Sequence, residues 1–192
     1  IPADGLIYVA GNVTRLEGEL DGRVTIASNG HIYITGSLVY VDDEGDTAYL
    51  NGDDPDQPYE PNPDYDGASV LGVIARDDIR YREDVPTNFE LNGSFLAKEG
   101  RIGITGISLD SNGEASLSGW GEYIKNSIRR LGGVISNERP VATYIDEDYM
   151  VQAGFLRGVS IYDRKLQFRP PVGFPGRRRP KKLSTVSKEV VR

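Results

Sequence analysis

The sequence contains no cysteine, a single histidine and no long apolar run. Without cysteine the chain can form no disulfide, no thiolate metal site and no cysteine nucleophile. The single histidine, His31, excludes a histidine-rich metal centre, and any Ser-His-Asp triad would have to use it. An apolar run of about 18 residues, the length that marks a membrane helix, is absent, so we expect no membrane span in these residues.

Two catalytic signatures are also missing: the Gly-x-Ser-x-Gly elbow of serine hydrolases and the glycine-rich phosphate loop. His31 follows an Asn-Gly turn and is expected at the surface or at the edge of a strand. The adjacent carboxylates Asp77-Asp78 and Glu83-Asp84 lie near an expected strand. Neighbours in a strand point to opposite faces, so these pairs are poorly placed to flank one glycosidic bond and are expected to face solvent.

What the chain does contain is a short motif that returns along its length. Apolar residues alternate around a glycine in residues 7–13, 32–38, 89–95 and 102–107, and a further short strand ends in an Asn-Gly turn within residues 22–30. Each copy presents one apolar face, and its glycine falls where a strand turns or admits a neighbouring backbone. Short strands repeated in this way predict an all-β fold, a degenerate β-solenoid or β-helix-like stack.

The composition agrees with a turn-rich β protein of one domain: 192 residues include 23 Gly and 11 Pro, and 38% are apolar. We expect this domain to span residues 1–175. Residues 42–67 read as an acidic inserted loop with few apolar anchors. Residues 119–133 are the best helical candidate, although an edge strand is equally compatible. Residues 176–192 hold seven basic residues and one acidic residue, which predicts a basic, disordered tail on an acidic body.

Three groups of residues form recognisable signatures: residues 22–34 (GRVTIASNGHIYI), residues 71–79 (LGVIARDDI), and a closing group of Gly154-Phe155, residues 161–166 (IYDRKL) and residues 170–175 (PPVGFP). The first two groups resemble the "Gly-x-Val-Thr-Ile", "Ile-x-Ile" and "Leu-Gly-Leu-Ile-Ala … Ile" segments of large prepilin-like, type IV pilus-associated bacterial envelope proteins. The third group resembles the closing signature of that family. The matches keep their order over most of the chain. Phe155 stands where the family usually has tyrosine.

The resemblance implies a β-solenoid-like domain that follows an upstream pilin-type helix, in type IV pilus or related envelope machinery. It therefore implies an extracellular, cell-surface or periplasmic location in a bacterium, and partners among other pilus or envelope subunits. The chain opens at Ile1 rather than at methionine, so we expect targeting information upstream.

The acidic loop is the candidate metal site. Clustered carboxylates would surround a hard cation such as Ca²⁺, which takes six to eight oxygen ligands. The alternative is a solvated, flexible acidic loop, because the spacing does not match an EF-hand. The metal-ligating candidates are Asp42, Asp43, Asp46, Asp53, Asp54 and Asp56.

Two further groups of residues are candidates for contact and for capping. The tail would meet phosphates of nucleic acid or lipid headgroups, or fold back on the acidic body, through Arg177, Arg178, Arg179, Lys181 and Lys182. The last strand is expected to close the stack through Tyr162, Leu166 and Phe168, whose even-numbered positions would place them on the same face of an extended strand. Pro170 and Pro171 are expected to stop further strand addition. Tyrosines in or beside strands, among them Tyr8, Tyr33, Tyr40 and Tyr81, would either stack on sugars or bases or pack between strands.

These observations favour a structural or adhesive, non-catalytic domain of a bacterial pilus or cell-envelope protein, without a resident cofactor. Two alternatives stay open. One is a polysaccharide-active enzyme on a β-helix, which a groove lined by two or more carboxylates would favour. The other is a DNA-contacting element of a DNA-uptake pilus, which the acidic body disfavours because duplex DNA requires positive potential at the contact face.

Overall fold

The computed structural model describes residues 1–51, 54, 57, 59–65, 67–104, 107–109, 115–117 and 124–174. These residues form an all-β protein, as the period-two pattern predicts, with one short 3-10 helix, η1 (Arg164–Gln167). Within them, no helix is long and apolar enough to cross a bilayer. The strands are β1 (Leu6–Val9), β2 (Val13–Leu20), β3 (Arg23–Ser28), β4 (Ile32–Tyr40), β5 (Tyr49–Leu50), β6 (Glu60–Pro61), β7 (Val70–Ala75), β8 (Ile79–Tyr81), β9 (Asn88–Ala97), β10 (Ile102–Ile104), β11 (Ile107–Leu109), β12 (Ala115–Leu117), β13 (Ile124–Ser136), β14 (Thr143–Ile145) and β15 (Val151–Ile161).

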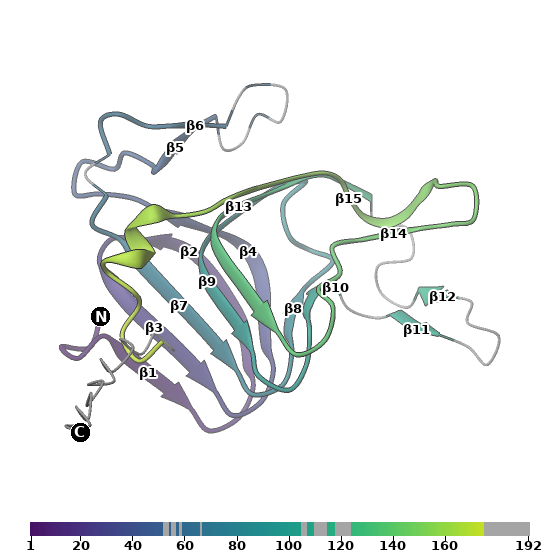
Figure 1. Cartoon of the computed structure of the whole chain (residues 1–192), viewed down its shortest axis with the longest axis horizontal. Coiled ribbons are helices and arrows are strands. Elements are labelled where there is room, and N and C mark those ends of the chain that lie inside the picture. Colours follow the sequence, from purple (N-terminus) through teal and green to yellow (C-terminus); the bar gives the residue numbers. More distant parts are fainter. Residues whose placement is uncertain are drawn as a thin grey trace, which may run out of the picture.

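A first parallel ladder joins β1, β3, β7 and the second halves of β9 and β13 (Figure 1). In this register, apolar residues of successive strands are partners of one another. The column is Ile7, Ile26, Val73, Phe95 and Val134. A one-residue slip would turn each apolar side chain to the opposite face, so this alignment sets the register.

A second parallel ladder joins the first halves of β2 and β4 to β8 and β10. Val13, Ile32, Ile79 and Ile102 form one column, and the last three are buried. A parallel bridge between Gly103 and Val141 extends the ladder by one more position.

A third ladder joins the ends of β2 and β4 to the first half of β9, the first half of β13 and β15. The antiparallel β14 adds to β15 at its edge. The chain therefore passes from the first ladder to the second and the third, returns to the first, and pairs each strand with its equivalent from the previous passage.

The three ladders enclose one hydrophobic core, to which each contributes buried side chains. Three aromatic rings lie at its centre: Phe89 meets Tyr81 edge-on at 5.4 Å between ring centroids and stacks on Phe155 at 5.7 Å. All three rings are at most 2% exposed. Aromatic contacts of this kind add to the stabilisation from burial itself.

Residues 124–136, which overlap the helical candidate, form the strand β13. It is not an edge strand, because it pairs in parallel with β9 on one side and β15 on the other. Ile128 and Leu131 are buried in this position. Tertiary pairing on both sides outweighs the weak helical spacing of the apolar residues.

One glycine of the recurring motif, Gly93, lies in a close backbone approach to Gly132. Gly93 and Gly132 are register partners in β9 and β13, and Gly132 has a positive φ of 132°. A Cβ at Gly132 would overlap the Gly93 carbonyl oxygen. The two backbones therefore come closer than a side chain would allow.

We expect Gly132→Ala to lower the free energy of unfolding by about 2 kcal/mol or more, from the strained φ together with the overlap with Gly93. Gly133→Ala is the matched control, because a Cβ there has no heavy atom within 4 Å and its φ is not positive. Urea unfolding of both variants measures the difference. Equal stability of the two variants would contradict the close approach.

The expected cap at the end of the chain is wrong in its form. Residues 164–167 form η1 instead of extending a strand, because the Asp163 side chain accepts a hydrogen bond from the Lys165 N–H at 2.9 Å and caps the turn. Because of this turn, Tyr162, Leu166 and Phe168 no longer face the same side, as they would in an extended strand. Tyr162 is 55% exposed, Phe168 is 84% exposed, and Leu166 is only half-buried.

Of the two prolines that follow, Pro171 packs on the outer side of the first ladder. Pro171 is buried, and a Cβ at Gly72 would lie 2.7 Å from the Pro171 Cβ. Arg23 donates a hydrogen bond to the Pro170 carbonyl at 3.0 Å. The segment therefore covers a small-residue position of β7, which only glycine leaves open.

Candidate functional site

The insertion between β4 and β7 folds against the outer side of the third ladder (Figure 1). The insertion, predicted to have few apolar anchors, is nevertheless fixed by buried apolar residues. Ala48 and Tyr49 are buried, and the rings of Tyr49 and Tyr59 stack with 4.3 Å between their centroids. The antiparallel pair β5 and β6 carries both tyrosines at or beside its strands.

Arg129 of β13 is the main polar anchor of the insertion. Its side chain is 3% exposed, and its guanidinium donates hydrogen bonds to the carbonyls of Asn51, Asp54 and Gln57. It also lies 5.1 Å from the centroid of the Tyr59 ring. A buried guanidinium with several carbonyl partners fits the rule that buried charges are retained when they are hydrogen-bonded. Asn51 takes a left-handed φ of 58° at this contact, a conformation that asparagine tolerates.

Glu90 of β9 is the register partner of Arg129 and is 6% exposed. The Tyr59 hydroxyl and the Asn92 amide each donate a hydrogen bond to its Oε1 at 3.0 Å. The Glu90 N–H donates to Ser37 Oγ at 3.1 Å. Burial, followed by the nearby Glu90 charge, raises the pKa of Tyr59 well above its usual value, so Tyr59 stays protonated and donates.

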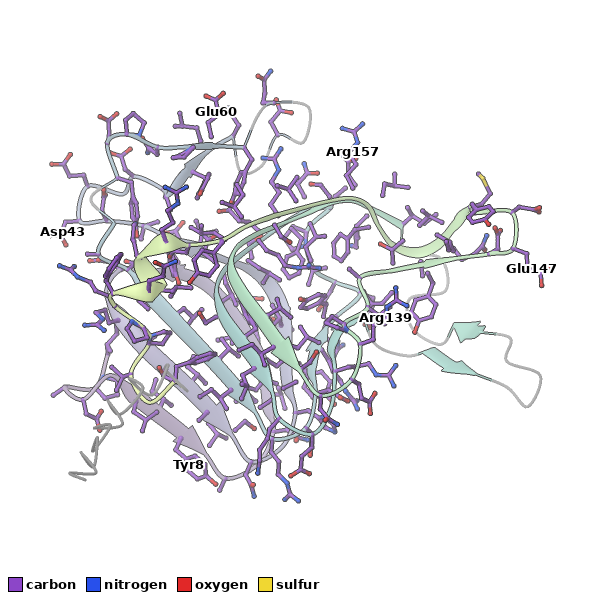
Figure 2. All side chains as sticks on the ribbon, in the orientation of Figure 1. Tyr8, Asp43, Glu60, Arg139, Glu147 and Arg157 are labelled. Carbon is purple, nitrogen blue, oxygen red and sulfur yellow. The ribbon has the colours of Figure 1, made fainter. Side chains whose placement is uncertain are left out.

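A cavity of about 340 Å³ lies between the insertion and this ladder, and we call it the insertion cleft. Tyr59, stacked on Tyr49, lines a second cavity of about 280 Å³ that contains Arg129 and Arg157. Figure 2 shows Arg157 on the same side of the molecule as Glu60 of the insertion. The insertion cleft is lined by Glu19, Ser37, Val39, Thr47, Tyr49, Asn51, Asn88 and Glu90.

Sequence reasoning missed the residues that build this cleft. Glu90 and Asn92 alternate with the core residues Phe89 and Leu91, which is also the pattern of a solvent-facing strand. Nothing local separates a polar side chain facing water from one facing an insertion that folds over it.

The acidic loop does not gather the predicted metal ligands within the described residues. Asp42 Oδ1 accepts hydrogen bonds from the N–H groups of Glu44 and Asp46 at 3.0 and 2.9 Å, so this carboxylate closes a turn. Asp43 is exposed on the rim of the insertion (Figure 2). Asp54 uses its carbonyl to bind Arg129. In the part of the chain that the structure describes, no group of three or more His, Asp or Glu residues is placed to hold a metal ion.

Asp53 and Asp56 lie outside the described residues, so calcium binding stays a prediction. The basic contact residues Arg177, Arg178, Arg179, Lys181 and Lys182 lie outside them too. Contact of this tail with nucleic acid or another anion therefore also stays a prediction.

Of the adjacent carboxylates, Asp78 forms a structural cluster with His31, Arg80 and Arg101. Asp78 accepts hydrogen bonds from the Arg101 N–H and from the Arg80 guanidinium, both at 2.8 Å. The Asp78 N–H donates to His31 Nδ1 at 3.2 Å. These contacts tie the turns before β4, β8 and β10 together. Glu83 pairs with its neighbour Arg82 at 3.5 Å.

The pKa of Asp78 is lowered. Burial raises it, but the hydrogen bond from the Arg101 N–H and the hydrogen bond and charge of Arg80 together outweigh burial. A carboxylate with a lowered folded-state pKa contributes stability above its unfolded pKa, and this contribution is lost as the pH falls through the folded value.

We therefore expect Asp78→Asn to lower the melting temperature most at neutral pH, with the gap to the wild type closing below about pH 4. Thermal melts from pH 3 to 7, values chosen to bracket that range, measure the gap. Asp77→Asn is the control, since its carboxylate has no partner among the described residues. A gap that is constant over this range would show that the charge of Asp78 does not contribute.

The strand tyrosines do not form one exposed stacking surface. Tyr40 and Tyr81 are each 1% exposed, whereas Tyr8 is 66% exposed. The Tyr40 hydroxyl accepts a hydrogen bond from the Leu71 N–H at 2.9 Å, and burial raises its pKa above the usual range. Packing between strands is therefore the role of the buried pair.

In comparisons with known proteins, no family model, no curated protein and no solved structure matches the chain.

Proposed function

We propose that this chain is a non-catalytic structural and adhesive domain of a bacterial pilus or cell-envelope protein, built as a three-sided β-solenoid. The observation that carries the proposal is the order of pairing. Successive passages of the chain through the three ladders align residue by residue, from Ile7 through Ile26 and Val73 to Phe95 and Val134. Each repeat then contacts its neighbours alone, as in repeat proteins.

Such a stack is suited to presenting a surface. Its interior is filled by apolar side chains, and a segment inserted between strands can pack against the stack from outside, as Ala48 and Tyr49 do. The insertion before β7 is one such segment. The resemblance of the chain to prepilin-like envelope proteins supports a location at the cell surface, outside the cell or in the periplasm, and partners among pilus or envelope subunits.

Immunogold electron microscopy of the source bacterium, with antibodies against the purified 192-residue chain, tests this location. We expect label on surface appendages or on the envelope, and none in a strain that lacks the gene. Label confined to the cytoplasm would exclude the proposal.

One observation favours a second candidate, a polysaccharide-active enzyme: two carboxylates, Glu19 and Glu90, line the insertion cleft. Glycoside hydrolysis uses a pair of carboxylates. A reducing-end assay on a panel of polysaccharides, with Glu90→Gln as the comparison, separates the candidates. Product formation that Glu90→Gln abolishes would replace the non-catalytic proposal.

A further inference from the structure

The insertion cleft combines groups that form hydrogen bonds with hydroxyls. Its lining contains two carboxylates, two amides, two aliphatic hydroxyls, one phenol ring and one aliphatic side chain, and neither lysine nor arginine among the described residues. We propose that the insertion cleft binds a neutral saccharide, either a free mono- or disaccharide or the corresponding unit of a longer glycan. The proposal deepens the adhesive role proposed above and rests on it.

The polar groups are poised both to donate and to accept. Ser37 Oγ accepts from the Glu90 N–H, so its own hydroxyl proton can be donated to a ligand. Thr47 Oγ1 donates to the Tyr49 carbonyl at 2.8 Å, so its lone pairs can accept. The exposed Glu19 carboxylate has no partner among the described residues and can accept as well. Sugar hydroxyls donate and accept at the same atom, which matches this mixture.

Tyr49 and Val39 supply the apolar part of the lining. A pyranose ring presents C–H groups as well as hydroxyls, and such mixed surfaces fit sites where a few polar groups lie beside apolar side chains. The cavity of about 340 Å³ lies at the lower end of the range of ligand pockets, roughly 300–1,000 Å³. This size suits a mono- or disaccharide unit and excludes a large cofactor.

The cleft is held open before any ligand arrives. Tyr49 stacks on Tyr59, Tyr59 donates to Glu90, and Arg129 holds the Asn51 carbonyl. The two walls, the insertion and the third ladder, are therefore fixed relative to each other. Preorganisation lowers the entropic cost of binding, which matters for a small polar ligand that buries little apolar area.

Charge decides between ligand classes. The exposed Glu19 carboxylate would repel a phosphorylated, sulfated or uronic-acid ligand, because neither lysine nor arginine lines the cleft and Arg129, the register partner of Glu90, already donates to the carbonyls of the insertion. The competing chemistry is a polyamine, which both carboxylates would attract. The test therefore includes one ligand of each charge.

The test is an NMR titration of the ¹⁵N-labelled full chain with cellobiose, maltose, lactose, diacetylchitobiose, digalacturonate and spermidine. We expect saturable shifts of the amide signals of Ser37, Thr47, Asn51 and Glu90 with at least one neutral disaccharide, with a Kd of about 0.1–10 mM. Digalacturonate should leave these signals unchanged. Shifts at these amides with spermidine alone, or with no ligand up to about 50 mM, well above that Kd range, would overturn the proposal.

Glu19→Ala should weaken saccharide binding about tenfold, as expected for the loss of one hydrogen bond to a charged acceptor. Glu44→Ala is the matched control, because Glu44 is exposed in the same insertion and does not line the cleft. Thermal melts confirm that both variants fold. Equal affinity of the two variants would place the saccharide elsewhere and overturn the site. Immunogold label at the cell surface without saccharide binding would refute this inference and leave the proposed location standing.

Discussion

Phe89→Ala is expected to lower the free energy of unfolding by about 3–5 kcal/mol, the range for aromatic truncations in cores. Phe89 is 1% exposed and lies between Tyr81 and Phe155, so alanine would leave a cavity lined by two rings. It also belongs to the third ladder, where Ile128 is its register partner. The truncation would therefore loosen packing between consecutive passages of the chain.

Urea unfolding followed by circular dichroism measures the effect. Phe168→Ala is the matched control, since Phe168 is 84% exposed and its truncation should change stability by less than about 0.5 kcal/mol. If the two truncations cost the same, the interior does not hold the three rings as described.

Arg129→Met should cost about 3 kcal/mol and release the insertion from the third ladder. Methionine keeps much of the volume but donates no hydrogen bond, so the carbonyls of Asn51, Asp54 and Gln57 lose their donor. An unsatisfied acceptor costs roughly 1–3 kcal/mol where water cannot reach it, and because Asn51, Asp54 and Gln57 are exposed, water limits the sum. We expect faster proteolytic cleavage within residues 42–67 together with the lower stability.

Arg139→Met is the control for the loss of an arginine. Arg139 is exposed between β13 and β14 and its side chain has no partner among the described residues, so its replacement should change stability by less than about 0.5 kcal/mol. Cleavage of the insertion at the wild-type rate in Arg129→Met would show that the tyrosine stack alone holds it.

The strand pattern was open to prediction because it is local. Alternating residues such as Ile32 and Ile34 occupy one face of a strand whatever it pairs with, and both are fully buried. Residues 124–136 were harder, since Ile128 and Leu131 satisfy a helical spacing as well as a core position of β13. Pairing with two neighbouring strands resolves such an ambiguity, and the sequence alone does not show which strands pair.

The candidate site depends even more on tertiary contacts than the strands do. Three separate segments supply Tyr59, Glu90 and Arg129, and Arg129 contacts Asn51 across 78 positions of the chain. In the sequence, Glu90 is a polar residue of an alternating strand, a pattern that predicts exposure to water, and Arg129 lies in the stretch that also suits a helix. Burial of both follows only once the register pairs them and the insertion folds over them.

The sequence by itself therefore determined the all-β class, the glycines that allow close backbone approach, the presence of an insertion before β7, and the absence of cysteine chemistry. Those properties depend on side-chain period, backbone freedom and composition, which neighbours along the chain decide. Only the tertiary structure decided that the insertion is anchored, that residues 164–167 turn instead of extending, and that two carboxylates line one cleft. These depend on contacts between residues distant in the chain, whose free energies arise from register and burial and have no counterpart in a local pattern.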